Sequence, residues 1–101
     1  MKLTGKCKDD FFKWLEETDV SDTDLFWQWY KIPESMQYGV YVDFFDSVGL
    51  SIGVYKIDIS KWFGIILKNN RYLNNFKEGY STLSEARTEA IKKANEIYNK
   101  K

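Results

Sequence analysis

Histidine is absent from this chain of 101 residues, and cysteine and proline occur once each. Without histidine, the chain cannot build the Ser-His-Asp or Cys-His forms of nucleophilic catalysis or the common histidine-based zinc sites. The single cysteine, Cys7, cannot form a disulfide within the chain or a thiolate metal cage. Because Cys7 falls on the apolar stripe of a predicted helix, the sequence favours a buried structural thiol over a nucleophile.

Net charge is also missing, since 15 Lys+Arg balance 15 Asp+Glu at pH 7. This balance argues against a dominant polyanion-binding role, for which a basic domain is expected. The charges are nevertheless uneven: residues 9–24 hold seven acidic residues and one basic residue, whereas residues 56–77 hold five basic residues and one acidic residue. Such unevenness orients a partner or simply solvates two faces of the protein.

Long hydrophobic runs are absent. The longest uninterrupted run of apolar residues and glycine is 62–67, which is far too short to span a membrane. Residues 1–10 contain no apolar run that could serve as a signal peptide. We therefore expect a cytoplasmic protein without membrane contact, and the length favours a single domain covering residues 1–101.

Aromatic residues, in contrast, are abundant at 18%, with seven Phe, seven Tyr and four Trp. Each large ring buries about 150–250 Å², so a few rings suffice to build the core of a short chain. The surplus predicts that some rings reach the surface.

The N-terminal part predicts a helix over residues 5–18, with Thr4 as its N-cap. Residues 25–30 form a short aromatic segment, either one or two helical turns or an irregular plug, which Pro33 ends. The apolar stripe of the helix recurs at spacings of three and four residues and comprises Cys7, Phe11, Trp14, Leu15 and Thr18.

The segment 38–55, YGVYVDFFDSVGLSIGVY, predicts a β-hairpin. Apolar residues alternate along both of its halves, on either side of a turn at 46–49. Gly49 would take the left-handed conformation that a three-residue hairpin loop needs. In this register Phe44 lies opposite Ile52 on an aliphatic face, and a mixed face forms on the other side.

Residues 62–68 predict the next strand, with Phe63, Ile65 and Leu67 on the aliphatic face, and residues 72–76 predict a short fourth strand. Thr82 and Glu85 form a capping box for a helix that runs to about Asn99. The predicted fold is therefore α+β: an N-terminal helix, an aromatic plug, an antiparallel meander of three or four strands, and a C-terminal helix packed on one sheet face.

The mixed face of the hairpin is the candidate binding surface. Rings on a sheet stack nucleic-acid bases or anchor protein contacts. Alternatively, the N-terminal helix or the segment 25–30 covers this face, because large exposed apolar patches are rare on monomers. The candidate binding residues are Tyr41, Asp43, Phe45, Tyr55 and Trp62.

Acidic residues give little sign of catalysis. Asp46 opens the predicted turn, where aspartate is favoured for its local hydrogen bonds. Asp43 sits within a predicted strand, where aspartate is depleted, so it is either exposed or partnered. No glycine-rich phosphate loop or dinucleotide fingerprint is present. The sequence predicts no catalytic residue, cofactor or metal site, and a carboxylate metal enzyme built on Asp43 and Asp58 is kept as a third hypothesis.

Two resemblances bear on function. The order helix, three strands, helix resembles the topology of the double-stranded-RNA-binding domain, whose last helix begins with phosphate-binding lysines where this chain has Ser84-Glu85-Ala86-Arg87. The sequence also resembles small uncharacterised proteins of gut bacteriophages and related mobile elements, through LTGKC (3–7), SMQYGVYVDFFDSVG (35–49) and SEARTEAIKKANEIYN (84–99). This resemblance implies a phage-type accessory protein in the host cytoplasm and supplies no catalytic residues.

The leading hypothesis is a non-enzymatic protein-interaction module that binds a host or phage protein or a second copy of itself. The alternative is a nucleic-acid-binding domain, whose binding would weaken steeply with salt. Its candidate residues are Lys56, Lys61, Lys68, Arg71 and Lys77.

Overall fold

Three α-helices, one 3-10 turn and a three-stranded sheet make up the computed structural model over the residues that it describes, 2–18, 29–59, 61–68 and 71–100. The elements are α1 (Gly5–Thr18), η1 (Trp29–Lys31), α2 (Glu34–Ser47), β1 (Leu50–Asp58), β2 (Lys61–Lys68), β3 (Arg71–Tyr80) and α3 (Leu83–Asn99). The strands pair antiparallel in the order β1-β2-β3. The predicted α+β class is confirmed, with the C-terminal helix in contact with the strands.

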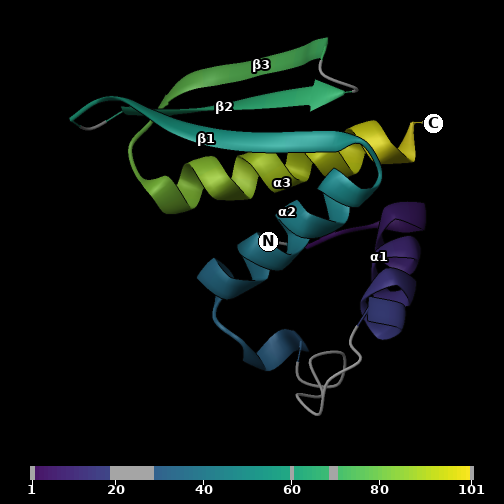
Figure 1. Ribbon diagram of the computed structural model, residues 1–101. Helices are drawn as coiled ribbons and strands as arrows, with labels where there is room; N and C mark the ends of the chain where they lie inside the picture. Colours follow the sequence, from purple (N-terminus) through teal and green to yellow (C-terminus); the bar gives the residue numbers. More distant parts are fainter. Residues whose placement is uncertain (1, 19–28, 60, 69–70, 101) are drawn as a thin grey trace.

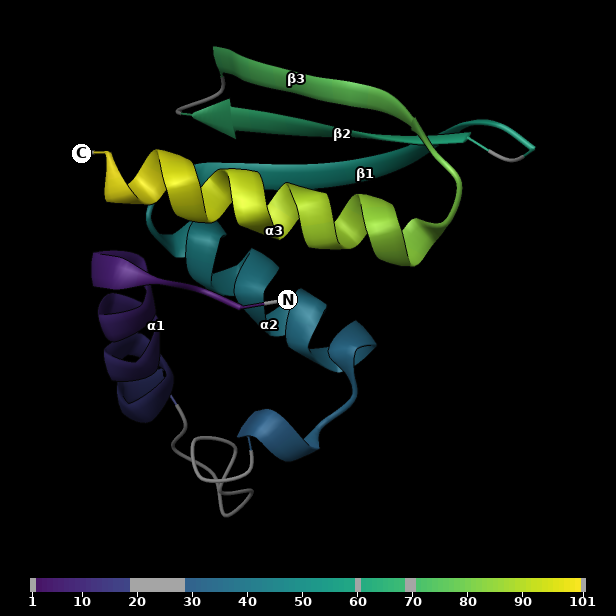
Figure 2. The ribbon, with the colours of Figure 1, turned by 180° about the vertical axis from the view of Figure 1, so that it is seen from behind.

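The described helices lie on one side of the sheet (Figures 1 and 2). α3 runs along the sheet and contacts all three strands, and α2 contacts β1. α1 packs against α2 and α3. This layering leaves the opposite face of the sheet without a covering helix in the described part of the chain.

The first half of the predicted hairpin is wrong, because residues 34–47 form helix α2 rather than a strand. The short turn η1 ends at Lys31, and Pro33 directly precedes α2. The Pro33 carbonyl accepts hydrogen bonds of 3.0 Å from the N–H groups of Met36 and Gln37. Residues 25–28 of the predicted plug lie outside the described residues. The side chains of α2 that are buried recur at positions i, i+4, i+7 and i+8, a helical spacing, and are Gln37, Tyr41, Phe44 and Phe45.

Gly49 has the positive φ that the sequence predicts, at +90°, but it ends a helix instead of turning a hairpin. Its N–H donates to the Asp46 carbonyl at 3.1 Å, and the Val48 N–H donates to the Phe45 carbonyl at 3.1 Å. A left-handed glycine directly after the last helical residues is a common helix terminator because it satisfies otherwise free carbonyls. β1 begins at the next residue, Leu50.

The predicted strand at 62–68 is confirmed as β2, and the predicted strand at 72–76 lies within β3. The pairing differs from the prediction: Ile52 lies opposite Ile66, not Phe44, and Tyr55 lies opposite Phe63. The assignment of the two faces of β2 is reversed. Gly64 and Ile66 are buried on the helix-covered side, whereas the residues predicted to face the core are only half-buried: Phe63, Ile65 and Leu67.

The C-terminal helix follows the prediction closely. The Thr82 hydroxyl accepts a hydrogen bond of 3.1 Å from the Glu85 N–H, so Thr82 is the N-cap. The small alanine side chains of α3 are fully buried and let the helix approach the sheet. The residues that are buried almost completely come from the first helix, the middle of the chain and α3: Cys7, Phe11, Leu15, Trp29, Phe44, Phe45, Leu50, Ile66, Ala86, Ala90, Ile91 and Ala94.

The first turn of α1 is capped differently from the prediction. The Thr4 hydroxyl does not cap its own helix but accepts a hydrogen bond of 3.0 Å from the Asn95 side chain. The Asn99 side chain takes the capping role, because its Oδ1 accepts a hydrogen bond of 2.8 Å from the Cys7 N–H. Asn99 Nδ2 also donates to the Thr4 carbonyl at 2.9 Å. The two asparagines of α3 thus tie the start of α1 to the end of the chain's last helix.

Candidate functional site

The five candidate binding residues do not form one surface. Tyr41 and Phe45 are buried on α2, with Tyr41 only 3% exposed, because both belong to the apolar stripe of that helix. Asp43 is exposed on the same helix. Tyr55 and Trp62 lie on neighbouring strands but at alternate positions, so their side chains leave the sheet on opposite faces. The predicted mixed sheet face of Tyr41, Asp43, Phe45 and Tyr55 is therefore wrong.

The burial of Tyr41 and Phe45 has a direct packing cause. The Tyr41 ring lies 4.9 Å from the Phe11 ring and 5.1 Å from the Trp29 ring, measured between centroids. Phe45 lies 5.2 Å from Phe44 in the same cluster. Burial raises the pKa of the Tyr41 phenol to about 12, although a hydrogen bond with the Trp29 side chain acts in the opposite direction. The contacts among the Phe11, Trp29 and Tyr41 rings join α1, η1 and α2.

Among the described residues, no helix covers the outer face of the sheet. Its residues follow from the alternation along β1 and β2, because Ile66 and its partner Ile52 point toward the helices. In both ribbon views the sheet lies above the helices, so its outer face points away from the helix layer (Figures 1 and 2). The side chains that the alternation places on this outer face are Ser51, Tyr55, Lys61, Phe63, Ile65 and Leu67.

An aromatic pair marks the outer face. The Tyr55 and Phe63 rings are directly opposite across β1 and β2, with centroids 5.6 Å apart at an interplanar angle of 37°. Tyr55 is 53% exposed, so most of its ring faces solvent. Such cross-strand aromatic pairs stabilise a sheet and present a flat apolar surface.

Gly53 explains why the Tyr55 ring lies flat along the strand. A Cβ atom built on Gly53 would stand 2.6 Å from both the Tyr55 Cε2 and hydroxyl oxygen. Only a residue without a side chain leaves room for the ring to cover the backbone at this point. The sequence signal for this arrangement was the Gly53-Val54-Tyr55 spacing, which places the two residues on the same face.

Basic and aromatic side chains meet near the end of the β1–β2 hairpin. The Lys56 ammonium lies 5.7 Å from the centre of the Trp62 ring, a cation–π contact, and Lys56 and Lys61 are both exposed. Lys68 is exposed at the other end of β2. The side chains of Arg71 and Lys77, which complete the predicted basic set, lie outside the described residues.

The acidic candidates are dispersed. Asp46 does not open a hairpin turn as predicted but lies in the last turn of α2, and its Oδ1 accepts a hydrogen bond of 3.3 Å from the Ser51 hydroxyl of β1. Asp43 is exposed on α2, and the side chain of Asp58 lies outside the described residues. Within the described part of the chain, no three His, Cys, Asp or Glu side chains gather as a metal site would require.

The comparisons with known proteins add no family. No protein-family model matches the chain, and searches of the curated proteins and of the solved structures found no match either. Among the described helices, none combines the length and the apolar character that crossing a membrane requires. The function therefore has to be inferred from the surface itself.

Proposed function

We propose that this protein is a non-enzymatic protein-interaction module that binds its partner through the outer face of the sheet, centred on Tyr55 and Phe63. The observation that carries the proposal is the exposed Tyr55 ring, packed on Phe63 in the middle of a face that no described helix covers. Tyrosine is a frequent energetic anchor in protein interfaces because it offers a large contact area at a low entropic cost.

The shape and composition of this face suit a protein partner. The aliphatic residues Ile65 and Leu67 extend the aromatic pair along β2, so the apolar contact surface is continuous along one strand. Lys61 lies at the hairpin end of the same row and is exposed. We infer a partner surface that is apolar in its centre and acidic at the edge that meets Lys61, because charge complementarity across an interface fixes orientation.

The resemblance to small bacteriophage proteins supports a partner in the host or phage, with the protein acting in the cytoplasm as an accessory factor. An interaction role also agrees with the composition, since the chain is rich in aromatic residues, carries no net charge and lacks histidine. Such an accessory protein changes the activity of its partner by covering part of the partner's surface, without catalysing a reaction.

Site-specific photo-crosslinking tests the proposal. A benzophenone amino acid is introduced at Tyr55 in one variant and at Met36 in a control, because Met36 on α2 is similarly exposed, at 57% compared with 53%. In cells that contain the partner, we expect a discrete crosslinked adduct from position 55 and none from position 36. Equal adducts from the two positions, or none from position 55, contradict the proposal. Sedimentation of the purified protein then shows whether the adduct is a second copy.

One observation favours the nucleic-acid alternative, namely the Lys56–Trp62 cation–π contact beside the exposed Lys61 at the hairpin end. Aromatic rings flanked by cations bind single-stranded nucleic acid by stacking and phosphate contact. Under this alternative, a labelled single-stranded oligonucleotide binds at low salt, and the Lys56→Gln/Lys61→Gln variant binds more weakly than Lys92→Gln. An absence of binding at low salt, or binding that ignores salt, rules this alternative out.

A further inference from the structure

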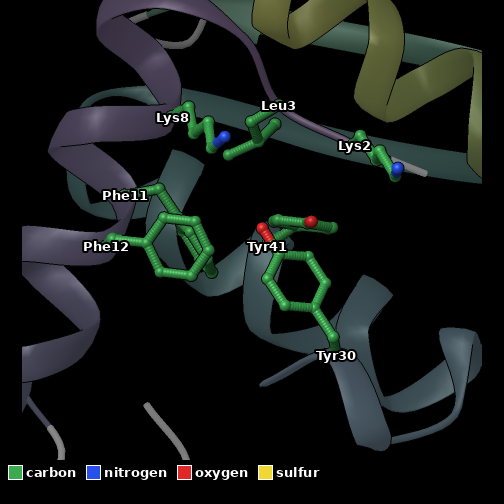
Figure 3. Close-up of a pocket in the computed structure, with 7 residues that line it drawn as sticks. All are labelled: Lys2, Leu3, Lys8, Phe11, Phe12, Tyr30 and Tyr41. Atoms are coloured by element: carbon green, nitrogen blue, oxygen red, sulfur yellow. The ribbon is translucent and has the colours of Figure 1, made fainter. Parts of the chain in front are cut away.

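A small cavity lies away from the sheet, between the N-terminal segment, α1, η1 and α2 (Figure 3). Its volume is about 120 Å³. An engineered apolar cavity of about 150 Å³ holds a benzene molecule, so this space is of the order of a single ring. The residues that line it are Lys2, Leu3, Lys8, Phe11, Phe12, Tyr30 and Tyr41.

The inner wall of the cavity is rigid and aromatic. Phe11 and Tyr41 are buried, and their rings pack against each other at 4.9 Å. Phe12 lies 6.1 Å from Tyr30, measured between ring centroids, and together they form the outer part of the wall. Side chains held by such contacts keep the cavity formed without a ligand, which lowers the entropic cost of binding.

The mouth of the cavity is cationic. Lys2 and Lys8 both line it, and no acidic side chain does. Neither ammonium group makes an ion pair within the described part of the chain. Tyr30 is 68% exposed, and its hydroxyl end points toward Leu3 and Tyr41 at the cavity (Figure 3). The polar groups that a ligand meets at the mouth are therefore two positive charges and one phenol.

We propose that this cavity binds a small carboxylate that carries one ring-sized apolar group. The apolar group would contact Phe11, Phe12 and Tyr41, and the carboxylate would meet Lys2, Lys8 and the Tyr30 hydroxyl. A cationic ligand is disfavoured by the two ammonium groups, and a larger ligand exceeds the volume. The site is independent of the sheet-face interface.

An NMR titration with benzoate as the probe tests this inference on the full chain. We expect benzoate to shift the backbone amide signals of Phe11, Phe12 and Tyr41 in a saturable way. Benzyl alcohol, which has a similar shape without the charge, should bind more weakly. No saturable shift at these residues, or equal binding of benzoate and benzyl alcohol, overturns the proposal.

Two lysine variants provide the matched comparison. Lys8→Gln should weaken benzoate binding by about two- to fivefold, the range for an exposed charge pair. Lys13→Gln lies on the same helix and outside the cavity lining, so it should leave the affinity unchanged. Equal effects of the two variants would show that benzoate responds to overall charge and not to this site. Tyr55→Ala should not alter benzoate binding, which separates this inference from the proposed function.

Discussion

The Oδ1 atom of Asn99 accepts a hydrogen bond of 2.8 Å from the backbone N–H of Cys7, so a side chain of the last helix caps the first turn of α1. The free N–H groups of a helix start need acceptors, and capping side chains usually come from the residues just before the helix. Here the acceptor comes from 92 positions away. Gly5 allows this approach, because it has a φ of +59° and its Cβ position lies 3.3 Å from the Asn99 side chain.

Replacing Asn99 by alanine should lower the free energy of unfolding by about 1–2 kcal/mol, the usual cost of losing a cap and its hydrogen bonds. The variant loses both the Cys7 contact and the bond to the Thr4 carbonyl. Urea unfolding followed by circular dichroism measures the change. Lys92→Ala, an exposed site on the same helix, serves as the control, and equal midpoints for the two variants would contradict the capping role.

Two glycine substitutions should change stability in opposite directions. Gly39 lies within α2, and a Cβ atom there meets no other atom within 4 Å. Gly39→Ala should therefore stabilise the protein by about 0.5–1 kcal/mol through helix propensity. Gly49→Ala should destabilise it by about 1–2 kcal/mol, because φ at this position is +90°. A destabilising Gly39→Ala would argue against a helix at residues 34–47.

Alanine substitution should destabilise the protein much more at Tyr41, which lies in the core, than at Tyr55, which lies on the surface. Tyr41→Ala removes a buried ring from the cluster with Phe11 and Trp29, and the expected loss is about 3–5 kcal/mol, by analogy with other large aromatic residues. Tyr55→Ala should cost about 1 kcal/mol or less, since the ring is half exposed and contributes one cross-strand pair. Thermal unfolding of the two variants checks the difference. Similar losses would mean that Tyr55 is a structural residue rather than an accessible contact.

Stability should fall at alkaline pH as the partly buried Tyr98 phenol ionises. Burial raises the pKa of Tyr98 to about 12, and its hydrogen bond to Asp10 at 2.5 Å and the charge of Asp10 act in the same direction. The folded state favours the protonated phenol, so this stabilisation is complete below the usual pKa of 10.0 and is lost as pH rises toward 12. Urea unfolding at a series of pH values should show a smaller alkaline loss for Tyr98→Phe than for the parent chain. An equal loss in both would exclude Tyr98 as a contributor.

The Cys7 thiol should be unreactive in the folded protein at neutral pH. Its side chain is fully buried, and burial, followed by the nearby Asp10 charge, raises its pKa from 9.0 to about 12. A chromogenic disulfide reagent at pH 8 should therefore label Cys7 only as fast as the protein opens, and labelling should become rapid in urea. Rapid labelling without urea would show that the start of α1 opens readily or that the thiol is accessible.

The sequence predicts an element correctly where a local feature, such as a capping box or an apolar run, permits only one type of secondary structure. The Thr82–Glu85 spacing located α3, and the continuous apolar run of residues 62–67, with a lysine at each end, located β2. The strand predicted for the first half of the hairpin is wrong because the apolar residues of 38–47 fit both the two-residue period of a strand and the 3.6-residue period of a helix. Val40, Val42 and Phe44 alternate as in a strand, whereas Tyr41, Phe44 and Phe45 follow the helical spacing that packing against Phe11 selects.

The binding surface was less predictable than the fold, for a reason that follows from this ambiguity. A change from strand to helix at residues 34–47 moved Tyr41 and Phe45 from a supposed surface into the core, and left Tyr55 with a different partner, Phe63. The capping role of Asn99 had no local signal at all, because its partner Cys7 lies at the other end of the chain. Contacts of this kind depend on the tertiary arrangement and not on neighbouring residues.

The tie between Cys7 and Asn99 also orders events during synthesis. On the ribosome, α1 is made first, and the side chain that caps it is polymerised after every strand of the sheet. α1 therefore leaves the exit tunnel without its native cap, and the cap can form only after translation has passed residue 99. The time taken to translate the chain between the two residues therefore sets the earliest point at which this cap can form.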